Sequence, residues 1–235
     1  MNKYTEMQAR QYETWASSWS IDNRDPVVGG FDLHNVWQDY DDYLFKDINK
    51  TESKVCIDFG CGPGRNLVKF GDRFKELHGV DISKTNLDNA KIWIEHNGRN
   101  ISNHKLFLTN GTDLSGIESS TYDVVMSTIC FQHICVYDIR YEFLKEFHRI
   151  LKKGGTLTMQ MGFGPKVETK SSVGYYENNI DAEGTNGQMD TRVEDPSELQ
   201  TDLEKIGFHK FNYYIRPVGP GDGHPNWIFF NATKK

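Results

Sequence analysis

The chain has 235 residues, with 27 Lys or Arg and 33 Asp or Glu, which gives a formal net charge of −6 at pH 7. This length is enough for one domain with a sizeable core, and the negative charge disfavours a large interface with the phosphates of DNA or RNA. No apolar run approaches the roughly 18 to 20 residues of a membrane span, and residues 1–15 lack the apolar core of a signal peptide, so a cytoplasmic protein without membrane contact is expected.

Two helical segments are predicted before the first strand. In residues 1–20, aromatic side chains recur at helical spacing and would share one face, whose simplest role is to pack onto the rest of the domain. Residues 22–30 predict a loop, and residues 31–48 return to helical spacing. Trp37 and Tyr40 in this second helix are candidates for the wall of a substrate pocket, and a purely structural helix is the alternative.

Residues 55–64 carry the most informative pattern, Val-Cys-Ile-Asp-Phe-Gly-Cys-Gly-Pro-Gly. The apolar run 55–59 predicts a buried strand, the three glycines predict a tight loop, and residues 66–74 predict a helix. Glycines allow positive φ and let a ligand lie against the main chain, while the helix N-terminus offers unpaired N–H groups. We therefore expect this loop to hold a nucleoside-like ligand.

Glycine spacing separates two classes of nucleoside cofactor. The dinucleotide fingerprint has glycine at its sixth position, where this chain has Arg65. The D-x-G-x-G-x-G arrangement instead resembles the first motif of the class I S-adenosylmethionine-dependent methyltransferases. Membership of that family implies that the loop holds the methionine end of the cofactor and binds no pyrophosphate. The residues that the resemblance assigns to this loop are Asp58, Gly60, Cys61, Gly62 and Gly64.

The second strand is predicted over residues 75–81 and its helix over 84–97, with Ser83 as the N-cap. Asp81 follows the first glycine by about twenty residues, the separation at which an acidic strand end reaches ribose hydroxyls. Ile82 follows it at the same strand end. Dinucleotide enzymes share this acidic residue, so it supports the methyltransferase resemblance only together with the glycine loop.

The third strand is predicted over residues 105–109. By the resemblance, Asn110 and Gly111 recognise the adenine ring, with Asp113 as the alternative to Asn110. The resemblance also implies an N-terminal helix over the cofactor, in which Tyr12 would contact the sulfonium through a cation–π interaction. S-adenosyl-L-methionine, converted to S-adenosyl-L-homocysteine, is the expected cofactor.

The fourth strand is predicted over residues 122–127 and runs into 128–134. Ligands bind at the carboxyl ends of parallel strands, so Cys130 and His133 are expected beside the transferred methyl group. An imidazole titrates in the range suited to a general base, and the alternative for His133 is a structural histidine bonded to local backbone.

The remaining elements complete an alternating pattern. A helix over residues 138–151 is predicted to end at a lysine and glycine cap in residues 152–155, before a fifth strand over 156–161. Residues 162–194 interrupt the pattern and predict a substrate lid, or a disordered solvent loop as the alternative. Tyr175 and Tyr176 in this segment are candidate substrate contacts.

Asp195 and Pro196 predict the start of a further helix that ends near Gly207. A sixth strand over residues 208–216 and a seventh over 226–232 follow, the last antiparallel to the rest. His224 and Trp227, near the turn between them, are further candidate substrate contacts. The predicted fold is therefore an α/β, doubly wound, mostly parallel sheet of seven strands with helices on both faces, the order that the resemblance implies.

One domain is expected: an N-terminal helical cap in residues 1–50, and a methyltransferase domain in 51–235 that contains the insertion 162–194. The four cysteines form no C-x-x-C pair, so no metal site is expected. We expect the cysteines to be reduced thiols. Cys61 and Cys130 are both predicted at strand ends, where they could approach each other.

The expected function is transfer of a methyl group to an oxygen or nitrogen atom of a small molecule. One alternative is a cofactor-binding regulatory module without turnover, and another is a protein methyltransferase. A nucleic-acid methyltransferase is disfavoured, because Ser-Thr-Ile-Cys-Phe-Gln follows the fourth strand in place of an N-P-P-[YF] motif. The acceptor and the oligomeric state do not follow from the sequence.

Overall fold

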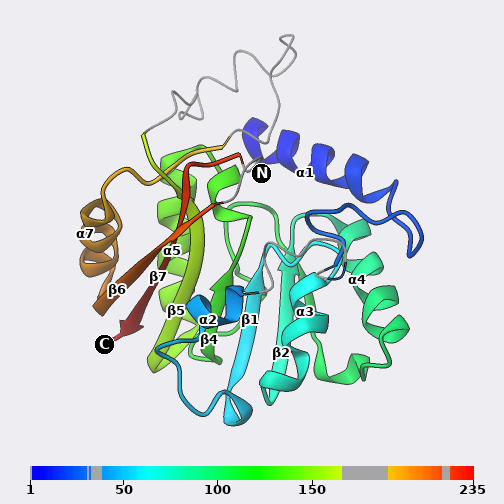
Figure 1. The fold of residues 1–235 in the computed structure, drawn as a ribbon, viewed down its shortest axis with the longest axis horizontal. Coiled ribbons are helices and arrows are strands. Elements are labelled where there is room, and N and C mark those ends of the chain that lie inside the picture. The colour runs from blue at the N-terminus through cyan, green and yellow to red at the C-terminus, as the bar shows by residue number, and fades with distance from the viewer. Residues whose placement is uncertain (1, 31, 33–38, 166–189, 219–222) are drawn as a thin grey trace.

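The computed structural model describes residues 2–30, 32, 39–165, 190–218 and 223–235. Its core is one seven-stranded sheet in the order β3-β2-β1-β4-β5-β7-β6, in which β7 is antiparallel to both neighbours (Figure 1). This arrangement confirms the predicted fold. The strands are β1 Val55–Phe59, β2 Glu76–Asp81, β3 Leu106–Leu108, β4 Tyr122–Ser127, β5 Leu151–Phe163, β6 Phe208–Pro217 and β7 Asn226–Lys234.

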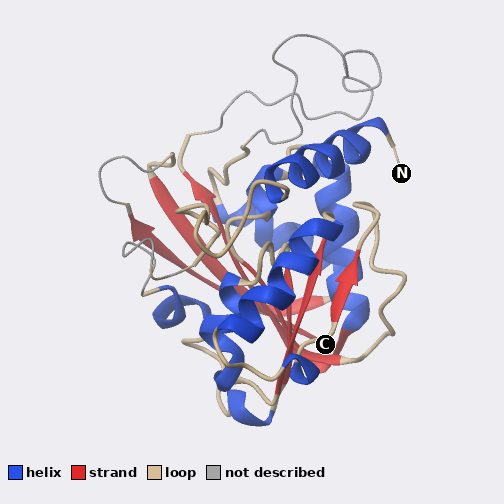
Figure 2. Ribbon diagram, turned by 90° about the vertical axis from the view of Figure 1, so that its right-hand side faces the viewer, coloured by secondary structure: helices blue, strands red, loops and turns tan. Residues whose placement is uncertain are grey.

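Helices cover both faces of the sheet, as the view of Figure 2 shows. Successive strand side chains point to opposite faces. Val125 of β4 accordingly joins a core cluster with α1, α5 and α7, while its neighbours Val124 and Met126 join one with α2, α3 and α4. The helices are α1 Lys3–Ala16, α2 Tyr40–Leu44, α3 Arg65–Phe70, α4 Lys84–His96, α5 Tyr137–Ile150 and α7 Pro196–Ile206. None of the described helices is long and apolar enough to cross a membrane.

Local signals fix several element boundaries as predicted. Ser83 caps α4 by accepting a hydrogen bond from the Asn86 backbone N–H at 3.0 Å. Asp195 caps α7 in the same way, with Pro196 at the first position, and Gly207 ends that helix at φ +117°.

Two element predictions are wrong. Within the described part of 31–48, only Tyr40–Leu44 is α-helical, and Asp39 at its N-cap makes no side-chain capping bond. The predicted cap in residues 152–155 instead belongs to β5, which begins at Leu151 directly after α5. Lys152 there pairs with Asp123 of β4 at 2.8 Å, so its charge serves a sheet contact and not a helix end.

Candidate active site

A cavity of about 600 Å³ lies at the carboxyl ends of β1, β2 and β4. Residues of α1 and of the loop that follows it form its other wall. Parallel α/β sheets bind ligands at this edge. The predicted site residues that line the cavity are Tyr12, Gly60, Gly62, Asp81, Ile82, Gly111, Cys130 and His133.

Two of these glycines are required by the packing around them. Gly60 has φ +72°, and a Cβ there would overlap the Cys130 side chain. Gly111 has φ +80°, and a Cβ there would come within 2.7 Å of Ile82 Cδ1. Both positions therefore combine a backbone conformation suited to glycine with a close approach, which leaves bare main chain at the cavity wall.

Asp58 lies beneath the glycine loop and is fully buried. Its Oδ2 accepts a hydrogen bond from Asn66 Nδ2 at 3.0 Å, and burial raises the pKa of the carboxyl to about 7. Among the described residues, neither Asp58 Oδ1 nor Asn66 Oδ1 has a hydrogen-bond partner. Buried polar atoms without partners are costly, and neither Asp58 nor Asn66 lines the cavity of about 600 Å³.

Asp81 is held in place at the end of β2. Its Oδ2 accepts a hydrogen bond from the Gly62 backbone N–H, and its Oδ1 accepts one from the Ser83 N–H, both at 2.9 Å. Burial raises the pKa of this carboxyl. Oδ1 also accepts a hydrogen bond from Asn86 Nδ2 at 3.3 Å, so the remaining capacity to accept a hydroxyl proton from the cavity side lies on Oδ2.

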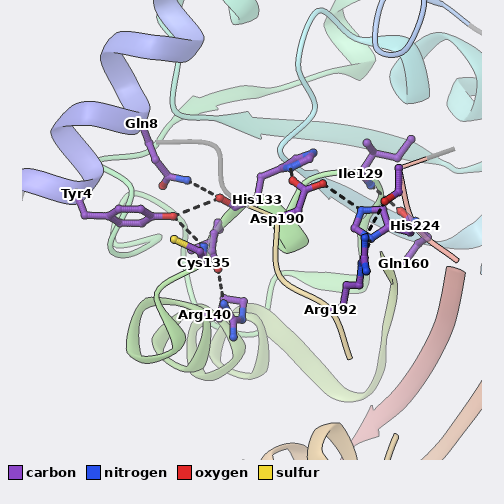
Figure 3. Close-up of polar contacts among 12 residues, drawn as sticks. Tyr4, Gln8, Ile129, His133, Cys135, Arg140, Gln160, Asp190, Arg192 and His224 are labelled. Atoms are coloured by element: carbon purple, nitrogen blue, oxygen red, sulfur yellow. Dashed lines mark hydrogen bonds and ion pairs between the residues drawn. The ribbon is translucent and has the colours of Figure 1, made fainter. Parts of the chain in front are cut away.

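Helix α1 is fastened at both ends of the cavity. Near its C-terminus, Glu13 accepts hydrogen bonds from Ser83 Oγ at 2.6 Å and from both the hydroxyl and the backbone N–H of Thr85. Near its N-terminus, Tyr4 Oη and Gln8 Nε2 donate to the backbone carbonyl of His133 at 3.2 and 3.0 Å (Figure 3). The helix thus connects the end of β2 to the turn that follows β4.

The chain after β4 adopts an unusual conformation. Ile129 has φ +50°, which is rare for a β-branched residue, and its backbone N–H donates to Gln160 Oε1 at 2.7 Å (Figure 3). Such strain persists where surrounding structure imposes it, often at functional sites. Here it directs the short helical turn Phe131–His133 toward the cavity.

His133 is bonded to a carboxylate that the sequence did not indicate. Its Nδ1 lies 2.5 Å from Asp190 Oδ1, and Asp190 Oδ2 lies 3.1 Å from Nε2 of His224 (Figure 3). Burial raises the pKa of Asp190, but hydrogen bonds from both histidines, reinforced by their positive charge whenever the rings are protonated, outweigh it and hold that pKa well below its usual range. Ionised Asp190 accepts the Nδ1 proton of His133, which makes Nε2 the basic ring nitrogen.

Three predicted substrate residues lie in the core and not at the cavity wall. Tyr40 is fully buried and packs edge-on against Phe229 at 5.0 Å between ring centroids. Trp227 is buried beside His224, whose two ring nitrogens bond Asp190 and Arg192. None of the three lines the cavity, and their contact with a substrate stays a prediction. Trp37, Tyr175 and Tyr176 lie outside the described residues.

Three other predicted cofactor residues, Asn110, Cys61 and Gly64, do not line the cavity. Asn110 is exposed, and its side chain bonds the backbone of Thr112 and Asp113. Buried Cys61 lines only a cavity of about 30 Å³ beside the glycine loop, and Gly64 caps α3. Within the described ranges, no group of three or more His, Cys, Asp or Glu is arranged to hold a metal ion.

Comparison with known proteins agrees with this geometry. A family model described as a methyltransferase domain matches residues 57–159. No match was found among curated protein sequences.

Solved structures share the fold at low sequence identity. A complex of the Haloferax volcanii Trm112 methyltransferase activator and its candidate methyltransferase matches with TM-score 0.64 and 18% identity, over 95% of this chain and 97% of that one. A Thermotoga maritima methyltransferase, described as a possible histamine N-methyltransferase, matches with TM-score 0.58 and 20% identity. The match covers 99% of this chain and 100% of that one.

A third structure contains ligands. Haemonchus contortus phosphoethanolamine N-methyltransferase 2, in complex with phosphomonomethylethanolamine and S-adenosylhomocysteine, matches with TM-score 0.66 and 18% identity. The match covers 98% of this chain and 60% of that one. At these identities the structures establish a shared fold.

Proposed function

We propose that this chain, which matches a methyltransferase-domain model over residues 57–159 and has the sheet order described above, transfers a methyl group from S-adenosylmethionine to an oxygen or nitrogen atom of a small molecule. Two of the compared structures are named for small amine substrates, which supports an acceptor of that size. The observation that carries the proposal is His133, a cavity residue bonded through Nδ1 to Asp190.

The cavity residues fit the cofactor. Asp81 would accept hydrogen bonds from the ribose hydroxyls, and the bare backbone at Gly111 would lie against the adenine. Asp58 and Asn66 do not line this cavity, and the buried Asp58 carboxyl would favour the ammonium group of the methionine end through its charge. When bound, this cofactor supplies an electrophilic methyl group on a sulfonium.

In this mechanism His133 removes a proton from the acceptor. Nδ1 donates to Asp190, so Nε2 is the atom that takes the proton from a hydroxyl or an ammonium group. The Asp190 carboxylate keeps the ring in this tautomer and stabilises the imidazolium that forms, as the carboxylate of a catalytic triad does. Alignment of the acceptor and exclusion of water supply the rest of the rate enhancement.

The same proposal gives residues 1–50 a role as a cap on the domain 51–235. Helix α1 contacts Ser83, just after β2, through Glu13 and the His133 turn through Tyr4, so it covers one side of the cavity. We infer that this cap must be in place for His133 to be aligned.

The test is a methyl-transfer assay with S-adenosylmethionine carrying a labelled methyl group. Phenols, carboxylic acids, primary amines and imidazoles would serve as acceptors, with bulk protein as a separate arm. We expect transfer to one small-molecule class, and loss of turnover in His133→Ala with S-adenosylhomocysteine affinity retained. Transfer only to protein, or cofactor binding without any transfer, would contradict the proposal.

A further inference from the structure

The carboxylate of Asp190 bridges two histidines with its two oxygens. Oδ1 bonds His133, the proposed base, and Oδ2 bonds His224, which lies just before β7. His224 does not line the cavity and cannot act on an acceptor directly. Its role must therefore be exerted through Asp190.

The protonation of His224 follows from its partners. Arg192 Nε donates to His224 Nδ1 at 3.1 Å, and a guanidinium has only donors, so Nδ1 is the acceptor nitrogen. The ring proton of His224 must then be on Nε2, from which it is donated to Asp190 Oδ2. Arg192 is itself oriented by a second bond, from Nη2 to the Gly223 carbonyl at 2.9 Å.

The surrounding backbone holds this array in place. The His224 ring occupies the space that a side chain at Gly162 of β5 would fill, and it packs on Trp227 at 4.6 Å between centroids. Residues 190–193 are tied to the His133 turn by the Thr191 N–H, which donates to the Gln132 carbonyl at 2.8 Å. The Val193 N–H ties the same segment to Gly162 at 3.0 Å.

We propose that His224 and Arg192 are positioning residues for the base. Arg192 fixes the tautomer of His224, His224 occupies Oδ2 of Asp190, and Asp190 is thereby held with Oδ1 on Nδ1 of His133 (Figure 3). The inference rests on the proposed role of His133. It adds two residues, outside the cavity, that determine which nitrogen of His133 is basic.

The test compares two substitutions of similar size. His224→Gln keeps an N–H donor for Asp190 and an acceptor for Arg192, whereas His224→Leu keeps neither. The readout is the tautomer of His133, measured by nuclear magnetic resonance of ring-labelled histidine in mildly alkaline buffer, where imidazole is neutral. The His133 signals are assigned as those absent from the spectrum of His133→Gln.

We expect the Nδ1–H tautomer of His133 in the wild-type protein and in His224→Gln, and its loss as the dominant form in His224→Leu. Arg192→Met, which removes the donor to His224 Nδ1, should shift the His133 tautomer in the same direction. It is the replacement test variant if His224→Leu does not fold. Once an acceptor is known, His224→Leu should lower kcat about tenfold, as expected for one hydrogen bond to a charged group, with His224→Gln near wild type.

An unchanged His133 tautomer in both His224→Leu and Arg192→Met would overturn the inference, as would equal effects of the Leu and Gln substitutions. The tautomer is measured without an acceptor, so this result is independent of turnover. Absence of methyl transfer by the wild-type protein would contradict the proposed function instead, and the two failures are therefore distinguishable.

Discussion

Tyr4 Oη lies 3.2 Å from the backbone carbonyl oxygen of His133 and donates a hydrogen bond to it. The same hydroxyl accepts a hydrogen bond from the Cys135 N–H at 2.9 Å. One fully buried side chain of α1 therefore fixes both sides of the turn that carries the proposed base. The packing of the N-terminal helix and the position of the His133 turn are therefore coupled through Tyr4.

Tyr4→Phe should destabilise the protein. The substitution keeps the ring but removes the hydroxyl that accepts a hydrogen bond from the Cys135 N–H and donates one to the His133 carbonyl, a loss of about 1 to 3 kcal/mol. Urea denaturation measures this as a lower midpoint with an unchanged slope. Tyr213→Phe is the matched control, because the Tyr213 side chain on β6 is exposed. It should change the free energy of unfolding by less than about 0.5 kcal/mol. Equal effects of the two substitutions would show that the Tyr4 hydroxyl contributes nothing.

Glu13→Gln should speed release of S-adenosylhomocysteine. Hydrogen bonds from Ser83 and Thr85 lower the pKa of Glu13, and the neutral amide would accept them more weakly. Glu13 is only partly buried, so the effect should not exceed roughly tenfold in the dissociation rate. Stopped-flow displacement measures that rate. Glu6→Gln, on the exposed face of α1, should leave the dissociation rate unchanged. An equal rate in the wild-type protein and both variants would show that Glu13 does not retain the ligand.

Gly60→Ala should be more destabilising than Gly62→Ala. Both glycines have positive φ, at +72° and +52°, which costs a non-glycine residue about 1 kcal/mol. Only at Gly60 would the added Cβ overlap Cys130, while nothing lies within 4 Å of one at Gly62. The overlap should add about 1 to 3 kcal/mol in ligand-free urea denaturation. Similar losses at both positions would mean that the Cys130 contact relaxes freely.

Asp58 should make stability depend on pH. Its pKa is raised from 3.8 to about 7 in the folded protein, mainly by burial. Because the folded protein holds this proton more tightly than the unfolded chain does, Asp58 stabilises the folded state fully at pH values below its unfolded pKa. This stabilisation is lost as the pH rises through about 7. Relative to Asp58→Asn, the wild-type free energy of unfolding should therefore fall by roughly 4 kcal/mol between pH about 4 and about 7. A difference that does not vary with pH would show that Asp58 ionises normally.

Much of the fold, and the positions of the glycine loop and of Asp81 at the cavity, could be predicted because the signals are local. The glycines at 60 to 64, Asp81 at a strand end, and the Ser83 and Asp195 caps each depend on a few neighbouring residues. The direction of β7 followed from the family resemblance. These features need no knowledge of distant contacts.

The polar array behind His133 could not be predicted, since sequence spacing does not encode it. Antiparallel pairing of β7 with β5 places Trp227 opposite Gly162, and so brings His224 to the strand end where Asp190 also lies. Tyr40 was misplaced for a related reason. Helical periodicity marks an apolar face without saying what covers it, and here Phe229 of β7 does.

The most direct test of the central claim is calorimetric titration of the purified protein with S-adenosylhomocysteine, S-adenosylmethionine and NAD, repeated with Asp81→Ala. We expect that both sulfur nucleosides bind, that NAD does not, and that Asp81→Ala weakens binding by roughly 2 to 4 kcal/mol while the variant remains folded. Binding of NAD instead, or equal S-adenosylhomocysteine affinity in a folded Asp81→Ala variant, would contradict it.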